Sequence, residues 1–256
     1  MRLELMTSPA VADYLDRSRG MVWPVGSTEQ HGPAGLIGTD HLCAEVIARR
    51  FGAAHGVIVA PTLAVGQSHF HLGFPGTLAL RPSTLMAVVA DMVASLQATG
   101  FRRLYILNGH GGNLAPIRAA LAEHYAAGSF AQKDAPDGLQ VRVRSWWELP
   151  AVDAMRKRLY GSSEGFHATP SEIAITLAAF PDHIGPLDLP APPSHGRNDL
   201  IDHAGDNYAE ASDFRRHFPD GRVISHSALA TKADGEALIS AAVADLASDY
   251  AAFLAA

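Results

Sequence analysis

The sequence predicts an α/β fold in which helices cover both faces of a mostly parallel sheet. Short apolar runs rich in Val, Ile and Leu alternate along the chain with longer segments whose apolar residues recur at helical spacing. The 256 residues are 48% hydrophobic and 18% charged, a composition that fits one large domain with a substantial core. We therefore expect a single domain over residues 1–256, with ligands bound at the carboxyl ends of its strands.

The expected elements follow from periodicity and from local start signals. Four short runs are predicted strands: Met21–Val25, Gly56–Ala60, Arg103–Leu107 and Leu139–Arg144. Three longer amphipathic segments between them are predicted helices: His41–Phe51, Pro82–Thr99 and Leu114–Ala127. Ser171-Glu172 follows Pro170 as a start signal for a helix over roughly Ser171–Phe180, and a last helix covers about Ala233–Phe253.

The segment from Pro181 to Arg222 differs in composition from the rest of the chain. It is rich in Pro, Gly, His, Asp and Arg, has little periodicity, and is too long for an ordinary connection. We expect an irregular excursion over about residues 181–222 that covers the site or meets another subunit. A mobile surface loop is the alternative.

Charge and cysteine content exclude several classes of protein. The net charge of −6 and the absence of a Lys/Arg cluster argue against a nucleic-acid partner. The single cysteine, Cys43, excludes an intrachain disulfide. The longest apolar stretches fall short of the roughly 20 residues that cross a bilayer. We expect a cytoplasmic protein without a membrane partner.

A glycine-rich loop, Pro24 to Asp40, carries the first chemical motif. It holds Glu29, His31 and Asp40 behind an apolar run and is short enough for these side chains to converge. Carboxylate and imidazole together suit zinc, manganese or iron. The loop predicts a metal hydrolase.

A second glycine-rich turn, Asn-Gly-His-Gly-Gly-Asn, follows the predicted strand that ends at Leu107. It presents His110 at the carboxyl end of that strand, beside the first loop if the two strands are parallel neighbours. A phosphate cradle is the alternative. The Rossmann glycine spacing and the Walker lysine are both absent, which argues against it.

Three further segments contribute candidate site residues. Ser68, His69 and His71 are candidates for a pocket wall, with a purely structural loop as the alternative. His167 and Glu172 stand five residues apart at a helix start and can face one cavity. Trp146 and Trp147 follow a strand and could form a floor under a planar substrate, or could be core residues.

These segments together resemble the creatininase family, the creatinine amidohydrolases and their relatives. The resemblance rests on the Gly-Ser-x-Glu-Gln-His-Gly-Pro loop ending in Thr-Asp, the Phe-Pro-Gly-Thr turn, the Asn-Gly-His-Gly-Gly-Asn turn and the later His-Ala-x-x-x-Glu. The tail from Asp213 to Arg222 also looks like that family, so the resemblance covers most of the chain. It implies a three-layer α-β-α sandwich, two divalent metal ions (zinc, with manganese or iron as alternatives) and a homo-oligomer, with a hexamer favoured.

The resemblance also implies a ligand set. Glu29 and His110 would hold one metal, His31 the other, and Asp40 would bridge both. Where creatininase itself has a glutamate ligand for the second metal, this chain has Gly112. The nearest compensating carboxylate is Glu172, which matches a glutamate of the family pattern. The alternative is that Glu172 is no ligand and stands in the first turn of a helix because the helix macrodipole favours a negative charge there.

The expected reaction follows from the metals. A metal-bridging hydroxide would attack a carbonyl that one ion polarises. His167 aligns with the candidate acid of the family and would protonate the leaving nitrogen, or would instead orient Glu172. We count His167 and Glu172 as candidate catalytic residues.

The expected substrate is a small cyclic amide or formamide that is cleaved at a carbon–nitrogen bond. Gly112 disfavours creatinine itself, because a ligand of the creatinine enzymes is missing there. The alternatives that keep the metal site are a peptidase and a carbon–carbon hydrolase of a cyclic polyol diketone, an inosose-type ring opening. The remaining alternative is a non-catalytic module that binds a metal or a sugar.

Overall fold

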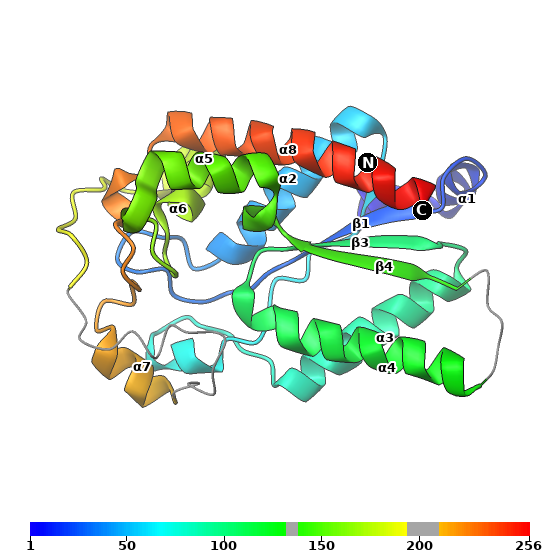
Figure 1. Ribbon diagram of the computed structural model, residues 1–256, viewed down its shortest axis with the longest axis horizontal. Helices are drawn as coiled ribbons and strands as arrows, with labels where there is room; N and C mark the ends of the chain where they lie inside the picture. Colours follow the sequence, from blue (N-terminus) through cyan, green and yellow to red (C-terminus); the bar gives the residue numbers. More distant parts are fainter. Residues whose placement is uncertain (132–137, 194–209) are drawn as a thin grey trace.

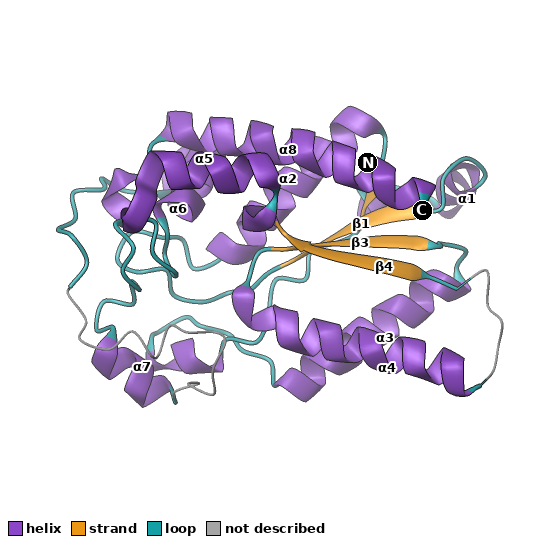
Figure 2. Cartoon of the chain, in the orientation of Figure 1, coloured by secondary structure: helices purple, strands orange, loops and turns teal. Residues whose placement is uncertain are grey.

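The central sheet consists of four parallel strands in the order β2-β1-β3-β4 (Figures 1 and 2). The structure, a computed structural model, describes residues 1–131, 138–193 and 210–256. All four predicted strands are present, with these bounds: β1 Gly20–Val25, β2 Ile58–Val59, β3 Arg103–Asn108 and β4 Gln140–Ser145. β2 is shorter than predicted, in part because Gly56 adopts a left-handed conformation that caps the preceding helix and so cannot begin the strand.

Side chains of the central strands alternate between two hydrophobic cores, as the pleat of a strand requires. Trp23 and Ile106 face one core, to which the helices α1 (Ser8–Leu15), α3 (Pro82–Ala98) and α4 (Leu114–Phe130) contribute. Val22 and Tyr105 face the other, to which the helices α2 (Thr39–His55), α5 (Pro150–Tyr160), α6 (Pro170–Ala179) and α8 (Lys232–Ala255) contribute. Figure 1 shows the two helical layers on opposite sides of the sheet. The predicted three-layer α-β-α sandwich is therefore confirmed.

The described residues form eight α-helices, of which five were predicted. Their bounds are α1 Ser8–Leu15, α2 Thr39–His55, α3 Pro82–Ala98, α4 Leu114–Phe130, α5 Pro150–Tyr160, α6 Pro170–Ala179, α7 Ala211–His217 and α8 Lys232–Ala255. The helices α1, α5 and α7 were not predicted. Each is short, so few of its residues repeat at helical spacing.

The excursion after α6 is not irregular throughout, which corrects the prediction for residues 181–222. Within its described part, α7 packs Phe214 and Phe218 against Phe70 and Phe74 of the segment that follows β2. This small third hydrophobic cluster stabilises α7, a helix that is too short to be predicted from the periodicity of its apolar residues. Residues 194–209 of the predicted excursion lie outside the described residues.

The last helix, α8, is long and apolar enough by length and composition to cross a membrane. In the structure its buried residues, among them Leu238 and Leu246, belong to the core shared with α2, α5 and α6. Its acidic residues bind neighbouring elements: Asp245 accepts a hydrogen bond from the backbone N–H of Ala151, and Asp249 pairs with Arg142 of β4.

Candidate metal centre

The loops that follow β1 and β3 begin side by side at the carboxyl edge of the sheet. Val25 pairs with Asn108, and the N–H of Gly109 donates to the carbonyl of Val25 at 2.7 Å. A Cβ atom at Gly109 would collide with the backbone oxygen of Asp40, so a residue without a side chain is required there. This close approach places His110, at the end of β3, beside Asp40 in the first turn of α2.

Asp40 lies between two histidines. Its Oδ1 is 3.0 Å from Nε2 of His31, and its Oδ2 is 3.1 Å from Nδ1 of His110. Glu29 lies beside the same His110 ring, with Oε2 3.4 Å from Nε2. None of the four side chains is more than 6% exposed. The structure thus brings together the four residues that the family resemblance implies as ligands, in a site shielded from solvent.

Each of the two histidine rings has one nitrogen committed to a main-chain carbonyl. Nδ1 of His31 is 3.0 Å from the carbonyl oxygen of Glu29, and Nε2 of His110 is 2.9 Å from that of Gln67. A carbonyl only accepts, so these nitrogens carry a proton. The opposite ring nitrogens, Nε2 of His31 and Nδ1 of His110, face the carboxylate of Asp40. If such a nitrogen is unprotonated, its lone pair is repelled by the carboxylate, and if it is protonated, the ring is a charged imidazolium. A divalent ion between ring and carboxylate removes the conflict, and such carbonyl contacts orient metal-bound histidines.

The carboxylates also lack donors. Both Oε atoms of Glu29 and Oδ2 of Asp40 are buried and form no hydrogen bond with the described residues, although histidine rings lie close by. Unpaired carboxylates in a buried site are strongly unfavourable, because desolvation is not compensated. The donor set of carboxylate and imidazole therefore fits a divalent ion such as zinc, manganese or iron.

Opposite charges shift the pKa values of these groups. Burial lowers the pKa of His31, but the negative charges of Asp40, Glu172 and Glu29 together raise it to about 10. Burial likewise lowers the pKa of His110, while Glu29 and Asp40 raise it more, to about 9. At Glu29 burial raises the pKa, but His110 and His71 hold it well below its usual range. Without ions, the carboxylates are therefore balanced by protonated histidines.

Metal binding is expected to release protons. Below a pH of about 9 both histidines of the metal-free protein keep their second proton, since their pKa values are about 10 and about 9. An ion must displace these protons, so binding should release about two protons and tighten as the pH rises from about 6 to about 8. Calorimetric titration with zinc in buffers of different ionisation enthalpy measures the number. Binding without proton release would contradict the tautomers assigned above.

Glu172 adds a second ligand group to the first. It lies in the first turn of α6, where its Oε2 accepts hydrogen bonds from the N–H and the hydroxyl of Thr169 at 2.9 and 2.8 Å. Ligand atoms of His31, Asp40 and Glu172 all lie within 4.8 Å of one another. The group of Glu29, Asp40 and His110 meets the same criterion. Asp40 is therefore shared by two overlapping groups.

The helix start that positions Glu172 also explains its electrostatics. Thr169 and Glu172 form a reciprocal capping box, which the sequence analysis did not predict, and the glutamate stands in the first turn of α6, as the alternative interpretation assumed. Burial raises the pKa of Glu172, and although His31 opposes this the pKa is about 7. The carboxyl group is thus both a helix cap and a buried neighbour of the candidate ligands.

His167 and His71 lie on the other side of Glu29. His167 contacts the carbonyl of Gln30 through Nε2 at 2.7 Å, which assigns the proton to that nitrogen and leaves Nδ1 3.6 Å from Oε1 of Glu29. Nε2 of His71 is 3.1 Å from the same oxygen. Burial lowers the pKa of His167, and the neighbouring His71 and His31 lower it further. His167 forms a third possible ligand group with Glu29 and His31.

The four residues proposed to bind substrate are all at least partly buried. Ser68 is fully buried and hydrogen-bonded to Ser27, and His71 lies against Glu29. Trp146 belongs to the core beneath α2, α5 and α8, and Trp147 packs against that core. The tryptophans therefore occupy the core position that the sequence left as the alternative, since the turn after β4 directs them into the helical layer. His69 lies in the same short 3-10 helix as His71.

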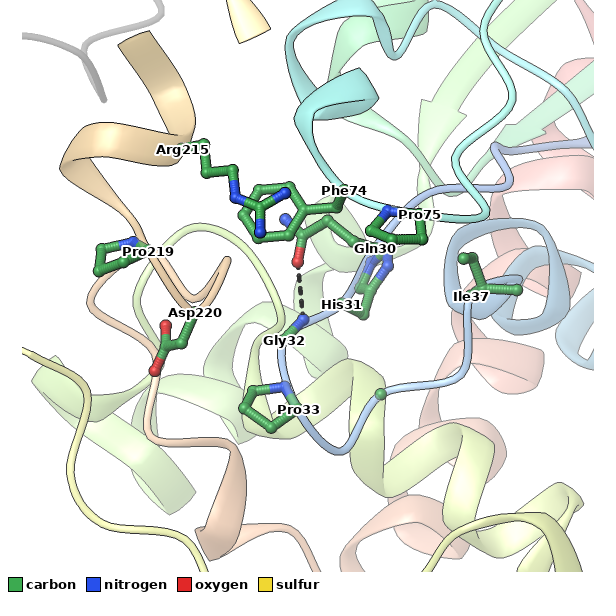
Figure 3. Close-up of a pocket in the computed structure, with 11 residues that line it drawn as sticks. Gln30, His31, Gly32, Pro33, Ile37, Phe74, Pro75, Arg215, Pro219 and Asp220 are labelled. Carbon is green, nitrogen blue, oxygen red and sulfur yellow. Dashed lines mark hydrogen bonds between the residues drawn. The ribbon is translucent and has the colours of Figure 1, made fainter. Parts of the chain in front are cut away.

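A pocket of about 340 Å³ opens beside Gln30 and His31. Its apolar lining includes Ile37, Phe74 and three prolines, and Figure 3 shows Arg215 and Asp220 at the same opening. One wall therefore comes from α7 and the residues after it. The sequence analysis assigned no function to Gln30 or Arg215. Only the position of Gln30 between Glu29 and His31 could have drawn attention to it.

Comparison with known proteins identifies the family. A family model described as creatininase, creatinine amidohydrolase, matches residues 4–249. The chain belongs to the creatininase family. A creatinine amidohydrolase from Pseudomonas putida is 32% identical over 177 residues, which are 63% of this chain and 65% of that protein.

Other relatives in the creatininase family differ in their named activity. A mycofactocin precursor peptide peptidase from Mycolicibacterium smegmatis is 39% identical over 39% of this chain and 42% of its own length. A 3-dehydro-scyllo-inosose hydrolase from Thermotoga maritima is 31% identical over 42% of this chain and 35% of its own length. The chain thus spans less than two thirds of each of these three relatives. They share hydrolysis, and they differ in substrate.

Solved creatininases share the fold over nearly the whole chain. A manganese form of creatininase has a TM-score of 0.79, and a creatininase variant of the Zn-Zn type has a TM-score of 0.78. Each is 25% identical and covers 97% of this chain and 96% of its own. These neighbours carry zinc or manganese, the metals that suit the donor set described above.

The turn after β3 is tightly packed at Gly112, the position where the family resemblance predicts that a metal ligand is missing. A Cβ atom at this position would lie 2.5 Å from Nε2 of His110 and 2.5 Å from the carbonyl oxygen of Gln67. The present arrangement of the turn therefore has no room for a side chain there. Among the described residues, Glu172 is the carboxylate that groups with His31 and Asp40 instead.

Proposed function

We propose that this creatininase-family hydrolase uses two divalent metal ions to cleave a carbon–nitrogen bond in a small cyclic amide or formamide. The observation that carries the proposal is the pair of buried ligand groups that share Asp40. Glu29, Asp40 and His110 would hold one ion, and His31, Asp40 and Glu172 the other. Zinc is the first expectation, with manganese or iron as alternatives.

The bound ions would lower the pKa of a water molecule and polarise the carbonyl of the substrate. The chain itself keeps the ligands in place: main-chain carbonyls set the tautomers of His31 and His110, and Thr169 orients Glu172. The apolar wall of the pocket limits access of water to the reacting bond.

His167 is proposed as the acid that protonates the leaving nitrogen. Its Nε2 proton is held by the carbonyl of Gln30, so Nδ1 is the atom that would take up and deliver a proton, with Oε1 of Glu29 at 3.6 Å to stabilise the charged ring. The alternative, in which His167 orients Glu172, lacks support: no hydrogen bond or ion pair joins these two side chains in the described part of the chain.

The size of the pocket favours a small substrate. Its volume of about 340 Å³ is at the lower end of the roughly 300–1,000 Å³ common for small-molecule sites. A peptidase and a carbon–carbon hydrolase remain the alternatives, in agreement with the names of two relatives.

A substrate screen with metal-loaded protein tests the proposal. Cyclic amides, formamides, short peptides and cyclic ketones are assayed for released ammonia, amine or formate and for new carboxylate. The expected result is hydrolysis of a cyclic amide or formamide that disappears after chelation and returns with zinc or manganese. If a cyclic ketone instead yields a product with a new carboxylate, the enzyme cleaves a carbon–carbon bond and not an amide. Purified protein without stoichiometric metal would overturn both.

The remaining expectations for this protein concern its surroundings. A homo-oligomer, with a hexamer favoured by the family resemblance, a cytoplasmic location, and the absence of nucleic-acid and membrane partners all stay predictions.

A further inference from the structure

We propose that Arg215 binds a carboxylate of the substrate, so that this enzyme acts on amides that carry a negative charge. The inference rests on the proposed function, because it assumes that the reacting bond lies at the ligand groups around Asp40. It concerns the pocket beside Gln30 and His31, at the wall that is formed by α7 and the residues that follow it.

The guanidinium of Arg215 is held in place by an aromatic ring and a main-chain carbonyl. It lies over the ring of Phe74, with Cζ 4.9 Å from the ring centroid, and its Nη1 donates to the carbonyl of Gly73. Among the described residues, no carboxylate forms an ion pair with it. An arginine side chain carries five N–H donors, so most of them stay available. The side chain is exposed and lines the pocket.

Among the described residues that line the pocket, Asp220 is the one carboxylate, and its charge is already compensated. Oδ2 of Asp220 accepts from Nη2 and Nε of Arg222 at 2.7 and 3.0 Å, and Oδ1 accepts from the backbone N–H of the same residue. Arg222 is only 2% exposed, which makes this pair a part of the folded wall. Arg215 therefore supplies a positive charge to the pocket that none of the described carboxylates compensates.

The surroundings of Arg215 suit recognition of a carboxylate. Pro75, Pro219 and Ile37 line the same pocket, so apolar surface borders the guanidinium at the opening. A planar guanidinium binds a carboxylate through two parallel hydrogen bonds, and its position over Phe74 together with its hydrogen bond to Gly73 limits the directions in which it can do so. Arg215 and His31 line the same pocket (Figure 3), and the buried His31 marks the side of the pocket on which the ligand groups lie.

Matched hydroxamates test the inference without knowledge of the natural substrate. The hydroxamate group binds the metal ions, and a tail of one to three methylene groups ends either in a carboxylate or in a neutral carboxamide. The monohydroxamates of malonic, succinic and glutaric acid and their carboxamide counterparts form three such pairs. With zinc-loaded full-length protein, at least one acid should bind about 10–100 times more tightly than its amide, the range for hydrogen bonds to charged groups.

Variants of α7 assign the preference to one side chain. Arg215→Met should bring the acid-to-amide ratio of affinities to about one, and Arg215→Lys should retain only part of the preference, because an ammonium lacks the planar fork. Arg216→Met is the matched control: Arg216 lies on the same helix, is exposed, pairs with Asp213 and does not line the pocket. Its ratio should not change. Equal affinity of all three variants for the neutral amides shows that the pocket stays folded.

The outcomes separate this inference from the function on which it rests. Native protein that binds acids and amides equally, or a preference that survives in Arg215→Met, would overturn the role of Arg215 and leave the metal hydrolase intact. If neither member of any pair binds to protein that contains metal, the pocket does not lead to the ions and the inference falls. Protein that retains no metal overturns the proposed function itself.

Discussion

Asp40→Asn is expected to remove both metal ions. The two carboxylate oxygens of Asp40 face His31 and His110, so this residue is the member that the two ligand groups share. The amide of asparagine cannot neutralise either ion. Affinity for each ion should fall by more than about 100-fold, since changes to residues that merely support a metal ligand already cost about 10–100-fold.

Metal content of the purified variant, measured by mass spectrometry after equilibration with zinc, checks this expectation, and hydrolysis should be lost with the metal. Asp91→Asn, which changes an exposed aspartate on α3, is the matched control and should retain both ions. An Asp40→Asn protein that binds two ions with native affinity would disprove the shared position of this carboxylate.

Glu172→Gln is expected to remove one ion and to leave the other. The group of Glu29, Asp40 and His110 does not depend on Glu172, whereas the group of His31, Asp40 and Glu172 loses one of its two carboxylates. Zinc titration should therefore show a fall from two tightly bound ions to one. The same site should be lost in Glu172→Ala, and retention of two ions with unchanged affinity in both variants would refute the assignment.

A control is needed because Glu172 also caps α6. Glutamine retains a side-chain oxygen that accepts from the N–H of Thr169, so Glu172→Gln removes the charge with little effect on the cap. Thr169→Val removes the capping hydroxyl and retains the carboxylate. It should lower the free energy of unfolding by about 1 kcal/mol and weaken the second ion by at most about 10–100-fold, because the N–H of Thr169 still holds Oε2 of Glu172. If Thr169→Val loses this ion as completely as Glu172→Gln does, Glu172 acts through the helix start and not as a ligand.

The strands and helices with the clearest patterns of apolar residues were predicted correctly from the sequence. The strands around Trp23 and Ile106 are buried on both faces, and such strands consist of continuous apolar runs that are easily recognised. Long helices such as α3 and α4 repeat apolar residues over several turns. The helix α7 has only a few turns, and what holds it is the contact of Phe214 with Phe70 and Phe74, residues that are distant in the sequence.

The site residues likewise divide into those that the sequence revealed and those whose surroundings depend on tertiary contacts. Glu29, His31 and Asp40 share one loop, so their common chemistry was visible in the sequence, and His110 was visible through its glycine-rich turn. The sequence left the environment of Trp146 and Trp147 open, because an aromatic pair after a strand suits either a core or a pocket. Packing against α2, α5 and α8 decided for the core.

The amino-acid sequence alone therefore determined the order of strands and helices, the family resemblance and the types of ligand atoms, since these depend on local pattern and on residue identity. The tertiary structure decided which nitrogen of His31 and His110 faces Asp40, that Glu172 joins them, and that Arg215 lines the same pocket. These features depend on contacts between segments far apart in the chain. Their distances and hydrogen bonds exist only after the sheet has brought the ends of β1 and β3 together and the helices have packed around them.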